Sequence, residues 1–285
     1  MKKFVFVPFA VAALFVFMIG VALAAPGIQA VWNQGFEQDT SGWFDLNSGW
    51  YGDMTRVSSG TNGIASAAGS WHAIASGDAD SAPFSRFDGY RDTWPGTWTA
   101  EIDVYLDPSW AAGTGFDYSV AASGSDGGHQ RDYIFHVTKD TSTGKLLVAG
   151  SNNSNFAPRE DLENINHYEV TTAGWYTLQH RFYDAGGLLA VDLNLLDSNG
   201  QLLFTETRTN ASDVIATEIG GNRYAWFTVI NVAGGIAVDN HQLFLNSVEI
   251  TKEMCKSGGW ESLYRADGSP FKNQGDCIQY ANTGQ

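Results

Sequence analysis

The clearest pattern of apolar and polar positions runs from Thr97 to Leu106. Apolar side chains alternate with polar ones: Trp98, Ala100, Ile102, Val104 and Leu106 are interleaved with Thr99, Glu101, Asp103 and Tyr105. Successive side chains of a strand point to opposite faces, so this alternation predicts a half-buried β-strand with an inner and an outer face. The turn-forming pairs Pro95-Gly96 and Asp107-Pro108 mark its two ends.

Short segments of the same kind recur along the chain between turns rich in Gly, Asn and Asp. We expect strands over residues 70–76, 116–122, 133–137, 146–150, 175–183, 188–196, 202–208, 223–231 and 236–245. Hairpins are predicted around 184–187 and 197–200, and a last strand pair around 233–235. A helical period is present only over 210–219. So many short strands predict an all-β fold, an antiparallel sandwich or barrel.

The tryptophans that alternate with other apolar residues inside strands are predicted to lie in the core. These are Trp98, Trp175 and Trp226. A large aromatic ring at a strand position with apolar neighbours stabilises the fold most when it is withdrawn from water.

The first residues predict export. Met1-Lys-Lys is followed by a long uncharged run, and Ala22-Leu-Ala24 has the small residues of a cleavage site, so residues 1–24 are predicted to be a signal peptide. The run is also long enough for an uncleaved membrane anchor, which is the alternative. Cleavage predicts a secreted, extracellular protein without membrane contact.

The charge restricts the partners. The formal net charge is −15, with 31 Asp and Glu against 16 Lys and Arg. Nucleic acids and anionic membrane surfaces attract basic patches, so neither is expected as a partner. A soluble exported protein that binds cations or neutral ligands fits this balance.

The composition changes after Lys252, and residues 251–285 are predicted to form a separate C-terminal cassette. It holds both cysteines of the chain, Cys255 and Cys277. In an exported protein two cysteines with no competitor predict a disulfide, and metal binding by them is the weaker alternative. The run from Cys255 to Trp260 and the run from Phe271 to Cys277 resemble a cassette of secreted bacterial proteins without assigned activity.

A resemblance to a known fold rests on four short runs. They are Asn33-Gln-Gly-Phe-Glu37, Gly42-Trp43, Trp226-Phe-Thr-Val-Ile230 and Gly235-Ile-Ala-Val-Asp-Asn240. Together they resemble concanavalin A-like jelly rolls and carbohydrate-binding modules. The resemblance implies a jelly-roll β-sandwich over residues 28–250 and a polysaccharide or other glycan as partner.

Two carboxylates on the polar face of the first predicted strand raise the question of catalysis. Glu101-Ile-Asp103 resembles the catalytic strand of laminarinase-type glycoside hydrolases, which implies roles for Glu101 and Asp103. The third carboxylate of that motif is missing, because Tyr105 or Leu106 takes its place. Retaining hydrolysis needs two carboxyl groups beside the scissile bond, so a solvated or ligand-contacting pair is the favoured interpretation.

A resemblance to alginate-lyase-type jelly rolls would imply a Gln-Ile-His strand, with a tyrosine and an arginine that neutralises a uronate. Gln179-His180-Arg181 and His136 supply these residue types in a different arrangement. A single histidine in a strand is more often structural, so this reading is the weaker one.

A structural calcium ion is a further expectation from the resemblance. In carbohydrate-binding sandwiches such an ion can join the first strand to the last through one carboxylate from each. Glu37 and Asp239 hold those positions here, with Asn240 or Asp39 as additional oxygen donors. The alternative is two acids exposed at strand ends.

Aromatic residues in polar, Gly-rich surroundings are the candidates for glycan contact: Trp50, Tyr51, Tyr90, Arg91 and Trp94. Flat rings beside hydrogen-bonding side chains suit the face and hydroxyl groups of a sugar. The alternative is that these rings close the ends of the sandwich. We therefore expect a secreted, non-catalytic glycan-binding or surface protein. A carbohydrate-active enzyme on the same fold and a structural envelope or matrix protein without a ligand remain open.

Overall fold

The predicted first strand is present and lies at the centre of one sheet. β7 (Trp98–Leu106) pairs with β12 (Gly174–Asp184) on one side and with β17 (Ile236–Ile250) on the other. Its five inward side chains, from Trp98 to Leu106, are completely buried. The ring of Trp98 stacks on Phe182 of β12 with centroids 3.7 Å apart. Period-two alternation thus produces the inner and outer faces that the sequence indicates.

The computed structural model describes residues 25–77, 81–124, 126–152, 159–216 and 218–285. The signal-peptide prediction for residues 1–24 lies outside this range. Within it, no helix is both long and apolar enough to cross a membrane.

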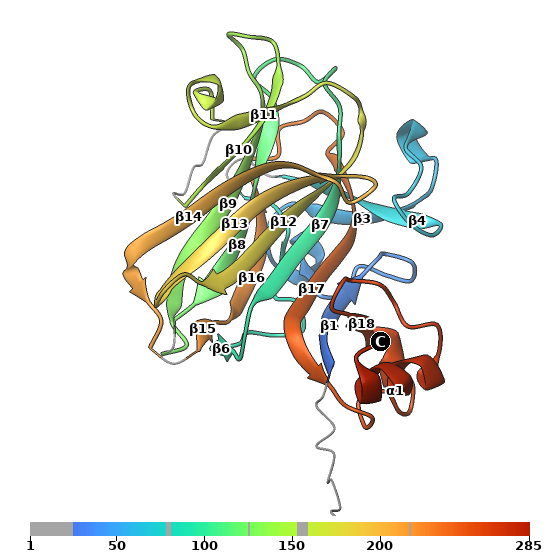
Figure 1. The fold of residues 1–285 in the computed structure, drawn as a ribbon. Coiled ribbons are helices and arrows are strands. Elements are labelled where there is room, and N and C mark those ends of the chain that lie inside the picture. The colour runs from blue at the N-terminus through green and yellow to red at the C-terminus, as the bar shows by residue number, and fades with distance from the viewer. Residues whose placement is uncertain (1–24, 78–80, 125, 153–158, 217) are drawn as a thin grey trace, which may run out of the picture.

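Two antiparallel sheets form a jelly-roll β-sandwich (Figure 1). Sheet A has the order β14 (Leu202–Val214), β13 (Leu188–Asp197), β12, β7, β17, β1 (Ala25–Gln34) and β18 (Leu263–Arg265), and β4 (Trp71–Ser76) pairs with both β17 and β3 (Asp53–Ser58). Sheet B has the order β11 (His167–Val170), β10 (Leu146–Ser151), β9 (His129–Lys139), β8 (Gly115–Ser123), β16 (Asn222–Thr228), β5 (Phe84–Ser85) and β2 (Trp43–Phe44). A small separate pair joins β6 (Thr93–Trp94) to β15 (Ile219–Gly220).

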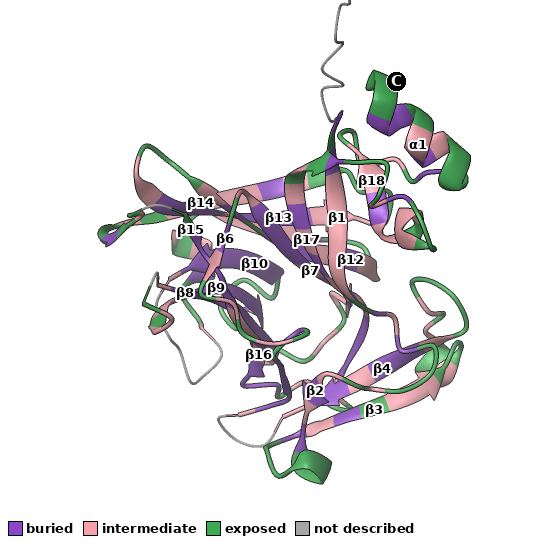
Figure 2. Cartoon of the chain, turned by 90° about the horizontal axis from the view of Figure 1, so that it is seen from below, coloured by how far each residue is buried: buried purple, intermediate pink, exposed green. Residues whose placement is uncertain are grey.

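The main hydrophobic core lies between the two sheets. Figure 2 shows the strands of both sheets with long buried stretches, whereas exposed residues gather in turns and in the C-terminal helix. The predicted hairpins β12–β13 and β13–β14 are confirmed by their antiparallel registers.

Two sequence predictions were wrong, one about strand pairing and one about a helix. The segments 223–231 and 236–245 do not pair with each other, because β16 belongs to sheet B and β17 to sheet A. The glycine turn between them therefore carries the chain from one sheet to the other. The helical period over 210–219 was also misleading: β14 continues to Val214, which pairs with Leu188 of β13. Hydrogen bonding to an existing strand overrides a weak local helical preference.

Two of the three tryptophans assigned to the core lie elsewhere. Trp98 is buried as predicted, but Trp175 and Trp226 are half-buried on the outer faces of their sheets. In β16 the inward positions are Ala225 and Phe227, so Trp226 points away from the core. Both faces of this strand are apolar, and its sequence alone does not distinguish them.

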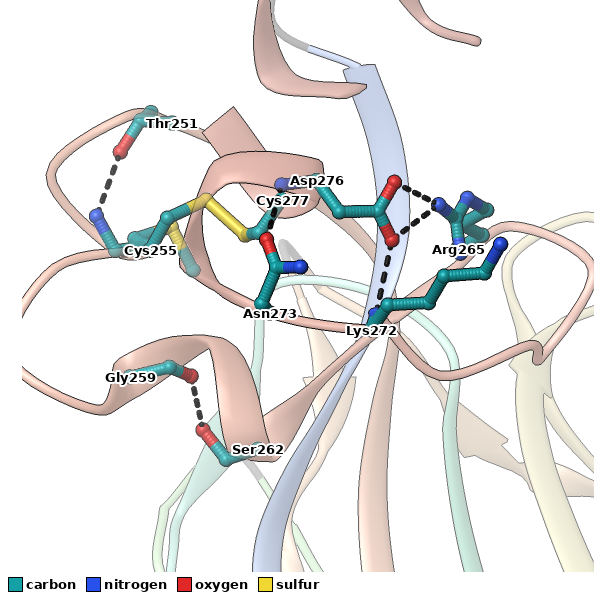
Figure 3. Close-up of a disulfide and its surroundings, with 10 residues drawn as sticks. Thr251, Cys255, Gly259, Ser262, Arg265, Lys272, Asn273, Asp276 and Cys277 are labelled. Atoms are coloured by element: carbon teal, nitrogen blue, oxygen red, sulfur yellow. Dashed lines mark hydrogen bonds and ion pairs between the residues drawn. A yellow bond between two sulfur atoms is a disulfide. The ribbon is translucent and has the colours of Figure 1, made fainter. Parts of the chain in front are cut away.

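The C-terminal cassette is closed by the predicted disulfide between Cys255 and Cys277, whose Cα atoms are 5.8 Å apart. The helix α1 (Gln274–Thr283) was not predicted; Asn273 caps its first turn through Asp276 N. Figure 3 shows the disulfide together with the bidentate contact of Arg265 with Asp276. Burial of the cysteines in a small apolar cluster gives the cassette a core of its own.

The cassette is attached to the first strand of the sandwich. β18 pairs with β1, and the hydroxyl of Tyr280 donates to the carbonyl of Pro26 at 2.8 Å. Ala25 and Ile250 of the sandwich strands complete the apolar cluster around the disulfide. Phe271 belongs to this cluster, and the half-buried Trp260 packs against it.

Removing the disulfide should loosen the cassette and leave the sandwich intact. Closing a loop of this length contributes about 3 kcal/mol in the chain-entropy model. In the double variant Cys255→Ala, Cys277→Ala we expect amide exchange to accelerate in β18 and α1 and to stay unchanged in β7 and β12.

Deletion of residues 252–285 should likewise leave the sandwich folded, because none of them belongs to the main core. Loss of cooperative unfolding in the truncated chain would show that the boundary at residue 251 is wrong.

Candidate functional site

A pocket lined by aromatic rings opens on the outer face of sheet B. It has a volume of about 210 Å³, and we call it the aromatic pocket; its lining residues are Trp50, Phe84, Arg86, Tyr90, Tyr224 and Trp226. Trp50 and Tyr90 are among the most exposed large hydrophobic side chains of the described chain. Exposed rings that gather around one cavity are characteristic of a binding surface.

The strands of sheet B place the floor of this pocket. Alternation in β16 sends Tyr224 and Trp226 outward, while Ala225 and Phe227 face the core. Phe84 of β5 is the register partner of Trp226, so their side chains are neighbours on the same face. The floor therefore consists of rings from two adjacent strands that are far apart in the sequence.

Hydrogen bonds hold the two indole rings in place. The Nε1 groups of Trp50 and Trp226 both donate to the carbonyl of Ala82, each at 3.2 Å. The ring of Trp50 also packs edge-on against Phe84, with centroids 4.7 Å apart. Tyr224 is held through its hydroxyl, which donates to Asp132 at 2.9 Å. The indole N–H donors are thus occupied, and the rings offer their apolar faces to a ligand.

The five residues proposed from sequence for glycan contact fall into different places. Trp50 and Tyr90 line the pocket, and Tyr51 contacts the ring of Trp50 from outside it. Arg91 pairs with Asp88 and lies over the ring of Trp94. Trp94 itself is buried in the main core.

Four pocket residues were not identified from the sequence: Phe84, Arg86, Tyr224 and Trp226. The Tyr224-x-Trp226 spacing was a usable signal, because residues two apart in a strand share a face. The partners Phe84 and Arg86 carry no such signal, since only the pairing of β5 with β16 brings them here.

A polar groove follows the outer face of sheet A beside the cassette. It consists of two adjoining cavities of about 360 and 280 Å³ that share Ile28, Thr99, Gln179 and Asn246. The cassette contributes Tyr264, Ala266 and Gly268 to its wall.

A row of hydrogen bonds between side chains begins at the polar groove and continues across sheet A beyond it. Gln179 donates to Glu101 at 3.2 Å and accepts from Asn194, which in turn accepts from Thr205. The row crosses four adjacent strands, from β7 to β14. Within the groove itself this row contributes the amide of Gln179 and the carboxyl group of Glu101.

Glu101 lines the polar groove, and Asp103 lies two residues further along the same face. Burial raises the pKa of Glu101 to about 7, although the hydrogen bond from Gln179 opposes this shift and the charge of Asp103 adds to it. Burial also raises the pKa of Asp103, whose oxygens accept bonds from Thr177 and Asn240. Glu101 is therefore suited to hold and release a proton near neutral pH, whereas the oxygens of Asp103 are occupied by neighbouring side chains.

Glu37 and Asp239 approach the same loop, but each carboxylate accepts backbone N–H groups from it. Glu37 accepts from Ser70 and Trp71, and Asp239 accepts from Ala68. Burial raises the pKa of Asp239 to about 6. Calcium needs six to eight oxygen ligands, and within the described ranges no three His, Cys, Asp or Glu side chains are grouped to hold a metal. A calcium site in which Glu37 and Asp239 are joined by backbone carbonyl oxygens therefore stays a prediction.

The two histidines considered for a lyase are buried. His180 points into the core toward the carbonyl of Tyr133, and burial lowers its pKa to about 3. His136 lies between Asp117 and Ser151, with both contacts at 2.7 Å. The order carboxylate, imidazole, hydroxyl is that of a Ser-His-Asp catalytic triad. However, all three side chains are buried, and none lines a cavity described above. We assign them a structural role.

Replacing Glu101 should change how stability depends on pH. Between pH 4.5 and about 7 the folded protein keeps a proton on Glu101 that the unfolded chain has released. The stability contributed by this group is therefore present below pH 4.5 and lost as pH rises through 7. Glu101→Gln should flatten the decline in unfolding free energy over that range, measured by urea denaturation. The matched control Glu249→Gln, at an exposed position of β17, should retain it. Parallel curves for Glu101→Gln and the wild type would contradict the assignment.

Comparisons with known proteins yield likeness of fold alone. No protein-family model matches the sequence, and no curated protein matches it significantly. Among solved structures, the CBM2 module of the evolved Dit of Lactobacillus casei BL23 phage J-1 has a TM-score of 0.46 and 12% identity, covering 79% of this chain and 98% of that chain. Peanut lectin in complex with a 9-mer peptide has a TM-score of 0.44 and 10% identity, covering 79% and 99%. The seed lectin of Lotus tetragonolobus has a TM-score of 0.42 and 10% identity, covering 75% and 97%. These proteins are lectin and carbohydrate-binding sandwiches, as the resemblance in sequence predicted, and the likeness assigns no ligand to this chain.

Proposed function

We propose that this chain is a secreted glycan-binding protein and that the aromatic pocket receives a sugar ring. The observation that carries the proposal is the convergence of half-exposed rings, Trp50, Tyr90, Tyr224 and Trp226, around one small cavity. Exposing an aromatic cluster to water raises the free energy of the folded protein, because contact between apolar surface and water is unfavourable. A ligand with an apolar face and a polar rim covers this surface and so removes the unfavourable free energy.

The size and rigidity of the pocket favour a single ring. Its volume of about 210 Å³ is below the roughly 300–1,000 Å³ of pockets that enclose drug-sized ligands. The C–H face of a sugar can stack on an indole, while the sugar hydroxyls reach water and the polar rim. Because Trp50 and Trp226 are already held by Ala82, little side-chain entropy is lost when a ligand binds.

Export is part of the same proposal and rests on the signal-like sequence of residues 1–24. The disulfide of the cassette supports it, because disulfides persist mainly in oxidising compartments. A structural envelope or matrix protein would share export and the disulfide, but a structural role does not account for a fixed pocket of exposed rings.

Truncating one ring should weaken glycan binding without unfolding the protein. Trp50→Ala removes the most accessible indole of the pocket, and we expect affinity to fall about tenfold or more, since burial of such a ring contributes on the order of 1.5–3 kcal/mol. Binding is measured by a glycan array followed by calorimetry on the hits. The matched control is Trp175→Ala, which removes a half-buried tryptophan from the opposite sheet, where its Nε1 donates to Ala65. Equal binding by wild type and Trp50→Ala would place the glycan elsewhere, and a negative array would favour the structural alternative.

A second candidate function is hydrolysis or elimination of a polysaccharide in the polar groove. It is favoured by one observation: Glu101 lines that groove, and its raised pKa allows it to be protonated near pH 7. A protonated carboxyl group is the general acid that glycosidic cleavage needs. The partner carboxylate that hydrolysis also needs would be Asp103.

Catalysis in the groove is tested by assaying reducing ends and unsaturated uronates on a polysaccharide panel. If Glu101 is the acid, the products appear with wild type and disappear with Glu101→Gln, whereas Glu249→Gln retains full activity. Turnover that survives both Glu101→Gln and Asp103→Asn would exclude these two residues as catalysts. No turnover on the panel leaves the binding function as the conclusion.

A further inference from the structure

One arginine of this acidic protein points at the aromatic pocket without an acidic partner. Arg86 is exposed and lines the pocket. Its guanidinium carbon lies 5.0 Å from the ring centroid of Phe44, 5.4 Å from that of Phe84 and 5.1 Å from that of Tyr90. Within the part of the chain that the structure describes, neither a hydrogen bond nor an ion pair engages its side chain. A cation–π contact uses none of the five N–H donors of a guanidinium, so all five remain available.

A second arginine also lies close to the ring of Tyr90. The guanidinium carbon of Arg223 lies 5.0 Å from the centroid of this ring, and its Nη1 donates to the carbonyl of Gly127 at 3.0 Å. Tyr90, one of the exposed rings of the pocket, therefore has two arginines in cation–π contact with it. Arg223 is also without a carboxylate partner among the described residues.

The nearby acids do not neutralise these two arginines. Asp88 is paired with Arg91, and Asp132 accepts from the hydroxyl of Tyr224 and contacts His129 at 3.0 Å. Among the described residues, the edge of the aromatic pocket thus carries two arginines without an ion-pair partner, in a protein whose formal net charge is −15. An unpaired guanidinium beside an apolar pocket is arranged for an anion brought in by the ligand.

We propose that the sugar bound in the aromatic pocket is acidic, with a carboxylate or sulfate that Arg86 contacts while the rings of Trp50 and Trp226 hold the sugar face. This inference rests on the proposed glycan-binding function and names the class of sugar. Arg86 is the specificity-determining residue, because a neutral sugar leaves its donors to water. Arg223 supplies a second charge that attracts the same group.

The negative net charge does not oppose this assignment at short range. Charges separated by more than about 8–10 Å are largely screened at physiological ionic strength, whereas a direct contact between Arg86 and a bound anion is screened less. The distant acids lower the rate at which a long polyanion approaches the protein. The structure therefore favours short acidic saccharides or chain ends with a single charged ring at the pocket.

The test compares matched acidic and neutral sugars on the whole mature protein. The probes are a glucuronate-containing disaccharide, its glucose counterpart and the corresponding 6-sulfated sugar, titrated by calorimetry and by tryptophan fluorescence. We expect the acidic probes to bind about five- to tenfold more tightly than the neutral one, with an advantage that shrinks as salt is added. The two acidic arms distinguish a carboxylate from a sulfate ligand.

Arg86→Gln removes the charge from an exposed position and should cancel that advantage while changing the affinity for the neutral probe by less than about twofold. Arg86→Lys keeps the charge but loses the planar fork, and it should retain part of the preference. Lys145→Gln, which removes an exposed cation paired with Glu169 and away from both cavities described above, is the matched control and should behave as wild type. Equal loss for acidic and neutral probes in Arg86→Gln would overturn the inference.

The outcomes separate this inference from the function on which it rests. If neutral and acidic sugars bind equally well and Trp50→Ala weakens both, the pocket binds glycans but the acidic preference is wrong. If no probe binds, or if binding is indifferent to Trp50→Ala, the proposed function fails with it. A preference for acidic probes that depends on both Trp50 and Arg86 supports the two together.

Discussion

The sandwich depends on the burial of the inner face of β7. Trp98 at its start stacks in parallel on Phe182 of the neighbouring strand, and its indole N–H donates to the carbonyl of Gly220 at 2.9 Å. Gly220 belongs to β15, so one side chain joins the centre of sheet A to the short strand pair at one end of the sandwich. A buried ring of this size contributes several contacts at once, and its donor is satisfied. The alternation that begins at Trp98 then determines which residues of β7 lie on its outer face.

Because the inner faces are committed to the core, each sheet offers only its outer face to ligands. The two outer faces differ in chemistry. Sheet B presents the rings of the aromatic pocket, held by indole bonds to Ala82 and flanked by Arg86 and Arg223. Sheet A presents a band of amides and hydroxyls around Glu101, with the cassette as one wall. One rigid scaffold thus supports a stacking site and a separate polar groove.

The cassette extends the sandwich instead of hanging free. Its short strand β18 lies beside β1, where it covers part of what would otherwise be an exposed sheet edge. The disulfide and the ion pair of Arg265 with Asp276 hold α1 within the cassette (Figure 3). The hydrogen bond from Tyr280 to Pro26 holds α1 against that edge. The same attachment places Tyr264 and Gly268 beside the polar groove. A segment too small to bury a large core alone therefore contributes both an edge cover and part of a binding surface.

The amino-acid sequence by itself determined the features that arise locally. Alternation over residues 98–106 predicted the strand and its inner face, turn residues predicted the hairpins around β13, and two cysteines without competitors predicted the disulfide. Only the tertiary structure decided which distant strands share a sheet. It paired β16 with β5 and so brought Trp226, Phe84 and Arg86 together, and it turned Trp226 outward although both faces of its strand are apolar. The physical reason is that period-two alternation separates two faces without naming the buried one, and pairing between distant segments depends on the packing of the whole chain.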